Sequence, residues 1–197
     1  MTERKNDPAA EPAGRDSLVQ TYIAMLRGIN VSGKKIIKME QLRASLAKLE
    51  FSNIKTYVQS GNIIFETSND SAASLSRKIE QKILRDFGFS VPVFLKTSKE
   101  MEEAIKRNPF LKVFAIDHSK LHITFLSDAP PKTALEQLLP LAVKPDQFRI
   151  IGREIYLYCP NGYGNTRLSN TAIERKLSVG ATTRNWTTAK TLLAMAQ

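Results

Sequence analysis

The chain has 197 residues, of which 42% are hydrophobic and 24% charged, a balance typical of a globular protein with its own core. It contains neither a secretory signal nor a run of about 18 apolar residues that could span a membrane, so we expect a cytoplasmic protein without a membrane partner. Cys159 is the only cysteine, which excludes an internal disulfide and a zinc site built on paired cysteines.

The net charge of +10 is concentrated in two segments. Residues 1–16 carry −1, so the rest of the chain carries +11. Residues 27–38 hold four basic residues and no acidic one, and residues 163–190 hold five basic residues against Glu174. Each segment therefore contributes +4. This clustering favours an anionic partner, although a solvated basic surface would have the same composition.

The predicted elements begin after a polar, proline-containing stretch, residues 1–16, which we expect to be a disordered tail. Apolar runs and alternation predict strands at residues 18–26, 54–58, 63–65 and 91–95. Apolar residues at helical spacing predict helices from residue 39 to 49 and from 75 to 87, the second ended by Gly88. The order βαββαβ is the ferredoxin-like arrangement, and we assign it to a subdomain of residues 17–97.

A second α+β subdomain is predicted for residues 98–197. After a linking helix at 98–107, the pattern gives a strand at 121–126, a helix at 133–141, strands at 148–151 and 155–159, and helices at 171–177 and 186–195. Between the linking and final helices the order is βαββα. It matches the first half without its closing strand.

Four short polar motifs interrupt these elements. They read LRGINVSGK at 26–34, YVQSGN at 57–62, GYGNTRLSN at 162–170 and ATTRNW at 181–186. In this order and spacing they resemble the motifs of the bacterial domain-of-unknown-function 1697 family, over about residues 18–196. Ser32 stands where that family commonly has glycine and Arg167 where it commonly has lysine, and both keep the chemistry. The resemblance implies a ferredoxin-like α+β architecture and brings no established activity, substrate or cofactor.

The first two motifs should lie side by side. With the usual spatial strand order four, one, three, two, the carboxyl ends of the first two strands share one edge of the sheet, and binding residues often sit on such loops. The basic groups could hold phosphate or carboxylate, whereas turn formation alone would also explain the glycines and amides. The candidate ligand-binding residues here are Arg27, Asn30, Lys34, Gln59, Ser60 and Asn62.

The third and fourth motifs each lead into a predicted helix. Thr171 with Glu174 fits a capping box, and Asn185 fits a cap of the last helix. Capping does not explain Tyr163, Arg167 or Arg184, because an arginine at a helix start opposes the helix dipole unless an anion or acid neutralises it. These three complete the candidate ligand-binding residues.

Sharper signatures do not occur in the sequence. It lacks a phosphate-loop motif, a dinucleotide fingerprint and an assembled catalytic triad, and His118 and His122 lack an acidic third ligand nearby. We therefore predict no cofactor and no metal. RNA-recognition domains share the predicted topology, but residues 61–65 lack the paired aromatics that stack bases, so nucleic-acid contact would go through loops and phosphates.

The leading hypothesis is a protein that binds an anionic ligand, either nucleic acid or a phosphorylated small molecule, in a basic cleft formed by the motif loops. Two alternatives stay open. One is a small enzyme acting on a phosphorylated or carboxylated metabolite, and the other is an interaction module whose basic loops dock an acidic protein.

Overall fold

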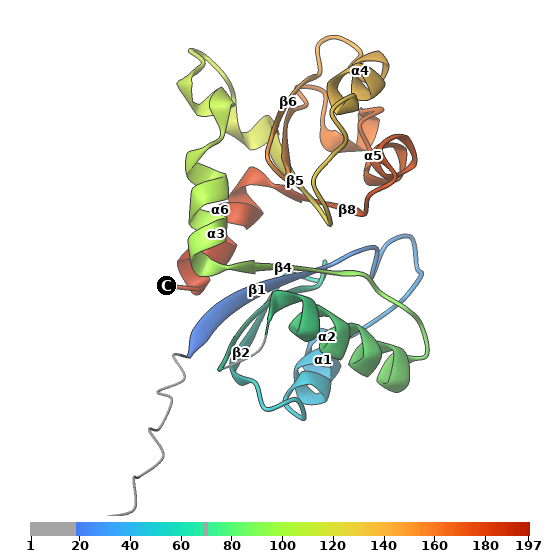
Figure 1. Cartoon of the computed structure of the whole chain (residues 1–197), viewed down its shortest axis with the longest axis vertical. Coiled ribbons are helices and arrows are strands. Elements are labelled where there is room, and N and C mark those ends of the chain that lie inside the picture. The colour runs from blue at the N-terminus through green and yellow to red at the C-terminus, as the bar shows by residue number, and fades with distance from the viewer. Residues whose placement is uncertain (1–18, 69–70) are drawn as a thin grey trace, which may run out of the picture.

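The computed structural model describes residues 19–68 and 71–197 (Figure 1). The tail predicted for residues 1–16 lies outside the described residues. The first half has the order βαββαβ, with these bounds: β1 Gln20–Leu26, α1 Met39–Leu46, β2 Ser52–Tyr57, β3 Asn62–Thr67, α2 Ala72–Phe87 and β4 Val93–Thr97. Its sheet has the order β2-β3-β1-β4 with antiparallel pairing throughout, which confirms the ferredoxin-like prediction and the predicted strand order.

The second half repeats this arrangement after a linking helix. Its helices and strands are α3 Ser98–Lys106, β5 Leu121–Leu126, α4 Ala134–Leu138, β6 Gln147–Ile151, β7 Glu154–Tyr158, α5 Asn170–Leu177, β8 Ala181–Asn185 and α6 Trp186–Met195. Short 3-10 turns lie at Pro109–Lys112, His118–Lys120, Leu139–Leu141 and Tyr163–Asn165. The second sheet has the order β6-β7-β5-β8, matching the first position by position.

Strand β8 corrects the sequence analysis, which gave the second half no closing strand. The segment Ala181–Asn185 pairs antiparallel with β5, with Ile123 opposite Arg184 and Leu126 opposite Ala181. Its residues are mostly polar, so it lacks the apolar alternation from which strands are predicted. Pairing with β5 and the burial of Ala181, Thr182 and Arg184 hold it in the sheet despite that composition.

Three apolar cores hold the chain together. Helices α1 and α2 cover the outer face of the first sheet, and α4 and α5 cover the outer face of the second. The inner faces of both sheets share the central core with α3 and α6, which run side by side between the halves (Figure 1). The sheet residues of this central core include Ile23, Met25, Ile64, Phe94, Ile123, Phe125 and Tyr156.

The faces of both sheets are covered, which limits how the protein could bind a ligand. Tyr22, the one aromatic on β1 that could have stacked a base, is 5% exposed and stacks on Phe65 at 5.7 Å between ring centroids. Both sheets are packed on both sides, so neither offers the open aromatic platform of RNA-recognition domains. None of the helices within residues 19–68 and 71–197 has the length and apolar character needed to cross a membrane.

Candidate functional site at the junction of the motifs

The first two motifs lie against each other, as the strand order predicted. The Asn30 amide donates to the carbonyl of Gln59 at 2.7 Å and to that of Ile37 at 3.0 Å, and its oxygen accepts from the Ile37 backbone N–H at 2.8 Å. One side chain therefore closes the loop of residues 28–38, named here the basic loop, and fastens it to the β2–β3 hairpin. Asn30 can do this because asparagine tolerates the left-handed conformation it adopts, with φ of 53°.

Arg184 reaches from β8 into the first half. Its side chain is buried, and its donors meet two side-chain oxygens and three carbonyls: Asn62 Oδ1 at 2.5 Å, Thr182 Oγ1 at 3.0 Å, Thr183 O at 2.9 Å, Leu26 O at 2.9 Å and Ser60 O at 3.3 Å. These bonds occupy all five N–H groups of a guanidinium. Burial lowers the pKa of Arg184 to about 10, so it stays charged at neutral pH.

Asn62 orients this arginine. It is fully buried, and its amide nitrogen donates to the Tyr57 carbonyl at 3.1 Å and to the Ser60 hydroxyl at 3.0 Å. Both donors are thus used within the hairpin, which turns the amide oxygen toward Arg184. The second and fourth motifs therefore form one packed unit across the two halves.

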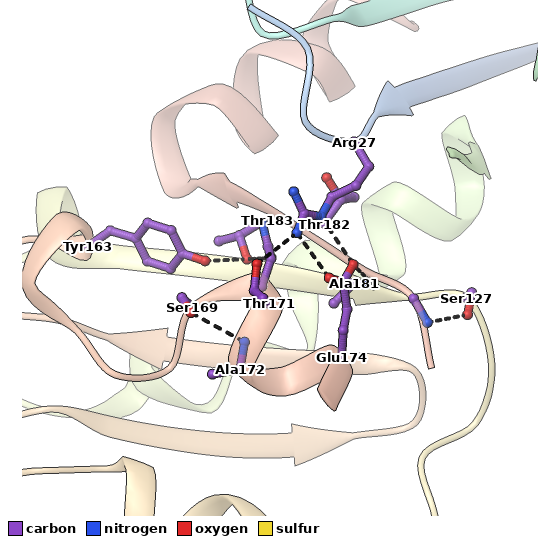
Figure 2. Close-up of polar contacts among 12 residues, drawn as sticks. Arg27, Ser127, Tyr163, Ser169, Thr171, Ala172, Glu174, Ala181, Thr182 and Thr183 are labelled. Atoms are coloured by element: carbon purple, nitrogen blue, oxygen red, sulfur yellow. Dashed lines mark hydrogen bonds and ion pairs between the residues drawn. The ribbon is translucent and has the colours of Figure 1, made fainter. Parts of the chain in front are cut away.

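Arg27 makes the second bridge between the halves. Its guanidinium binds the Glu174 carboxylate through two bonds of 3.1 and 3.0 Å and donates to the Thr171 hydroxyl at 3.3 Å (Figure 2). Glu174 also accepts from the Ala181 backbone N–H at 3.1 Å. The first motif is thereby joined to the helix that follows the third motif and to the start of β8.

Helix capping differs in part from the sequence analysis. Ser169, rather than Thr171, caps α5 by accepting from the Ala172 N–H at 3.3 Å (Figure 2). Thr171 lies inside the first turn, where its hydroxyl accepts from Arg27. Asn185 caps α6 as predicted, accepting from the Thr188 N–H at 2.7 Å.

Tyr163 joins a chain of hydroxyl groups at the same junction. Its hydroxyl donates to Thr183 at 3.0 Å (Figure 2). Thr183 in turn donates to Asn170 at 2.6 Å, and the Thr124 hydroxyl lies 2.7 Å from that of Thr183. The Tyr163 ring stacks on His122 with centroids 5.0 Å apart. Burial raises the pKa of Tyr163 and lowers that of His122, so both groups are neutral at pH 7.

The nine candidates therefore fall into two kinds. Six of them, Arg27, Asn30, Ser60, Asn62, Tyr163 and Arg184, hold the junction together with their side chains. Lys34, Gln59 and Arg167 are exposed, and their side chains have no hydrogen bond or ion pair within the described part of the chain. Lys34 and Gln59 belong to the basic loop and the adjoining hairpin, whereas Arg167 lines a separate hollow with Lys144, Asp146, Asn161 and Asn165.

Comparison with protein families bears on these motifs. A family described as "Protein of unknown function (DUF1697)" matches residues 19–156. The chain belongs to this family. The first two motifs lie within the residues matched to DUF1697, and the third and fourth lie beyond them.

A solved structure shows the same fold as this DUF1697 chain. The conserved bacterial protein SP0830 from Streptococcus pneumoniae matches with a TM-score of 0.69 and 22% sequence identity, covering 91% of this chain and 100% of that one. At this identity the likeness establishes the fold alone. The curated proteins yield no significant match to the sequence.

The sequence analysis missed Glu174 and Thr183 as members of the junction. Glu174 was assigned to capping and Thr183 to a loop before the last helix. A bidentate partner for Arg27 lies 147 residues away in the chain, and no local pattern in the sequence indicates such a pair.

Proposed function

We propose that the protein binds the phosphate backbone of nucleic acid through the basic loop, and that it does so in the cytoplasm. The observation that carries the proposal is a pair of exposed lysines, Lys34 and Lys38, on a loop whose conformation is fixed. Neither lysine has an acidic partner in the described residues, so both ammonium groups are available to phosphate oxygens.

Buried anchors fix the basic loop at its base. Ile29 and Ile37 are 2% and 1% exposed and pack in the core beneath α1 and α2, while Asn30 ties them to the hairpin. Lys35 donates to the Ser90 carbonyl at 2.7 Å and fastens the tip from the other side. A loop already held in place loses little conformational freedom on binding, which favours affinity.

The charge beneath the loop is not neutralised. Glu174 compensates Arg27, but the partners of Arg184 are carbonyl, amide and hydroxyl oxygens, with no carboxylate among the described contacts. A buried positive charge is screened less than a surface one and adds to the positive potential at the junction. The junction therefore presents a positive field to an approaching polyanion.

The surroundings favour phosphate contacts over base stacking. The basic loop contains no aromatic residue; of the aromatics in the adjoining motifs, Tyr57 packs against the central core and Tyr163 has its ring stacked on His122. Val31 and Ile36 are 59% and 58% exposed beside the lysines, where they can contact sugar edges. Such an interface would bind with little sequence preference.

The salt dependence of binding tests this proposal. Fluorescence anisotropy with a labelled DNA duplex and an RNA hairpin between about 50 and 200 mM salt should give a linear plot of log affinity against log salt, with a slope of about −0.9 per neutralised duplex phosphate. Lys34→Ala and Lys38→Ala should each lower the magnitude of the slope by about one. Matched controls are Lys112→Ala and Lys132→Ala, which remove exposed lysines far from the junction along the chain.

Three results would contradict the proposal. Absence of binding at about 50 mM salt, where surface electrostatics are strong, would reject a nucleic-acid partner. Equal losses in the control variants would show a diffuse basic surface rather than a site on the loop. Poly-glutamate that competes as well as the nucleic acid, with the same sensitivity to Lys34→Ala, would favour docking of an acidic protein instead.

A further inference from the structure

A cleft of ≈ 380 Å³ lies between the two halves, beside β4 and the end of β5. The first half contributes residues of β4 and of the first turn of α2, and the second contributes Phe125, Ser127 and Arg153. None of the nine motif candidates lines it. Small-molecule sites commonly have about this volume and commonly lie where two units of a fold meet.

Aromatic side chains and a buried ion pair form one part of the cleft. Phe94 and Phe125 border it with only 7% and 1% of their surface exposed, and Lys96 lies with its ammonium 5.9 Å from the Phe125 ring centroid. The Lys96 ammonium binds the Glu154 carboxylate at 2.6 Å, with side-chain exposures of 13% and 7%. This cross-half ion pair fixes the position of the lysine, so the apolar surface beside it is preformed.

Hydrogen-bond donors without partners line the same cleft. The Arg153 guanidinium is exposed and uses only Nη2, which donates to the carbonyls of Leu126 and Ser127. Its Nε and Nη1 have no partner among the described residues, and because their N–H groups point to different sides of the guanidinium, each can donate to an anion separately. Ala72 and Ala73 add small side chains on the opposite wall, which leave room beside the backbone.

We propose that this cleft binds a small molecule that carries one phosphate or carboxylate group on a flat apolar body. Arg153 would bind the anionic group, and the exposed part of Phe94 together with Val93 and Leu95 would contact the body. Glu100, which also lines the cleft, accepts from the Thr97 backbone N–H at 2.8 Å through Oε2 and forms the capping box of α3 with Thr97. This site is separate from the basic loop and would take a ligand of another size class.

Amide chemical shifts of the full chain, titrated with phenyl phosphate and in parallel with inorganic phosphate, test the proposal. Phenyl phosphate should shift the backbone amides of Ala73, Lys96 and Ser127 and should bind at least about tenfold more tightly than inorganic phosphate, because only the aryl compound buries apolar surface. The amides of residues 28–38 should not move with the aryl compound beyond their response to inorganic phosphate.

Two variants and their matched controls locate the site. Arg153→Ala should weaken phenyl phosphate binding about tenfold or more by removing a charge-assisted contact. Ala73→Trp should block binding by filling the cleft without deleting an interaction. Arg85→Ala and Ala44→Trp alter an exposed arginine and an exposed helical alanine elsewhere and should leave binding unchanged.

Each contrary result has a definite meaning. Absence of shifts at the cleft amides with about 10 mM phenyl phosphate, roughly the weak end of specific binding, would overturn the proposal. Equal affinity for phenyl phosphate and inorganic phosphate would overturn the inference that the ligand has an apolar body. Shifts confined to residues 28–38 would also overturn the cleft site while leaving the nucleic-acid proposal standing, so the two proposals fail separately.

Discussion

A single guanidinium, that of Arg184, satisfies oxygens contributed by both halves of the molecule. Its charge has no carboxylate partner in the described structure, so five hydrogen bonds take the place of an ion pair. The sequence analysis singled out this arginine as one that capping could not explain. It could not show that the side chain turns inward, because Arg184 lies on a strand rather than at a helix start.

Replacing Arg184 should cost stability in proportion to the donors that are lost. Arg184→Met leaves the Leu26 and Ser60 carbonyls and the Asn62 amide oxygen without a partner. Leu26 and Asn62 are buried whereas Ser60 is exposed, so at about 1–3 kcal/mol for each buried unsatisfied group we expect a loss of at least about 2 kcal/mol in the free energy of unfolding. Arg184→Lys has three donors in a compact head, so its free energy of unfolding should lie between those of the unaltered chain and of Arg184→Met. Urea unfolding measures both, and a fully stable lysine variant would contradict the bridging role.

His122 should make stability depend on pH. Burial lowers its pKa in the folded state, against about 6.5 in the unfolded chain, so the unfolded state binds the proton more readily. Protonation of His122 should therefore not reduce the free energy of unfolding above about pH 6.5, and this free energy should fall as the pH drops below that value. His122→Phe keeps the ring stack on Tyr163 and should remove this part of the pH dependence, whereas His118→Gln, at an exposed site, should retain it.

At the scale of elements, the β2–β3 hairpin depends on a glycine. Gly61 has φ of +73°, and a Cβ there would lie 2.6 Å from the Ile29 side-chain end and 2.7 Å from the Leu26 Cβ. Leu26 Cβ is attached directly to the backbone of β1 and cannot rotate away. The hairpin thus approaches β1 more closely than any side chain would permit.

A pair of glycine variants separates this close approach from backbone strain. Gly33 has the same φ of +73°, but a Cβ there would meet nothing within 4 Å. Gly33→Ala should lower the free energy of unfolding only by the cost of holding alanine in the left-handed conformation, about 1–2 kcal/mol. Gly61→Ala should cost a further 1–3 kcal/mol or so from overpacking. Denaturant midpoints would compare them, and equal losses would show that the approach relaxes freely.

Elements with regular apolar spacing were predictable from the sequence, and polar ones were not. The apolar run at β1 indicates a strand, and the spacing of Leu75, Ile79 and Ile83 in α2 indicates a helix. The structure has both elements. Strand β8 was missed because its threonines and arginine are held by pairing with β5 and by contacts across the halves. Ser169 rather than Thr171 caps α5 because the helix begins at Asn170, which places Thr171 inside the first turn, where its hydroxyl accepts from Arg27.

On the scale of the molecule, the sequence predicted each half but not how the halves meet. Strand order followed from topology, and it placed the basic loop beside the hairpin. The pairing of Arg27 with Glu174 and of Lys96 with Glu154 joins residues 147 and 58 positions apart. Such pairs leave no periodic trace in a single sequence, so the shared core around α3 and α6 could not be anticipated.

The shared core predicts that the two halves unfold together. Trp186, the only tryptophan, is 3% exposed in the central core and reports on the packing of α6 against both sheets. Urea unfolding followed by its fluorescence and by far-ultraviolet circular dichroism should therefore give coincident single transitions. Two separated transitions would show that each half is stable alone.

Breaking the Lys96–Glu154 pair tests how far this cooperativity extends. Glu154→Gln leaves the Lys96 ammonium buried without its counter-ion, which should lower the free energy of unfolding by about 3–5 kcal/mol. Because the pair bridges β4 and β7, both probes should shift by the same amount and stay coincident. Glu102→Gln removes the exposed partner of Lys106 within α3 and should leave both transitions nearly in place. A shift of the circular dichroism transition alone would mean that the pair stabilises one half without the central core, and the molecule would then have to be treated as two units in contact.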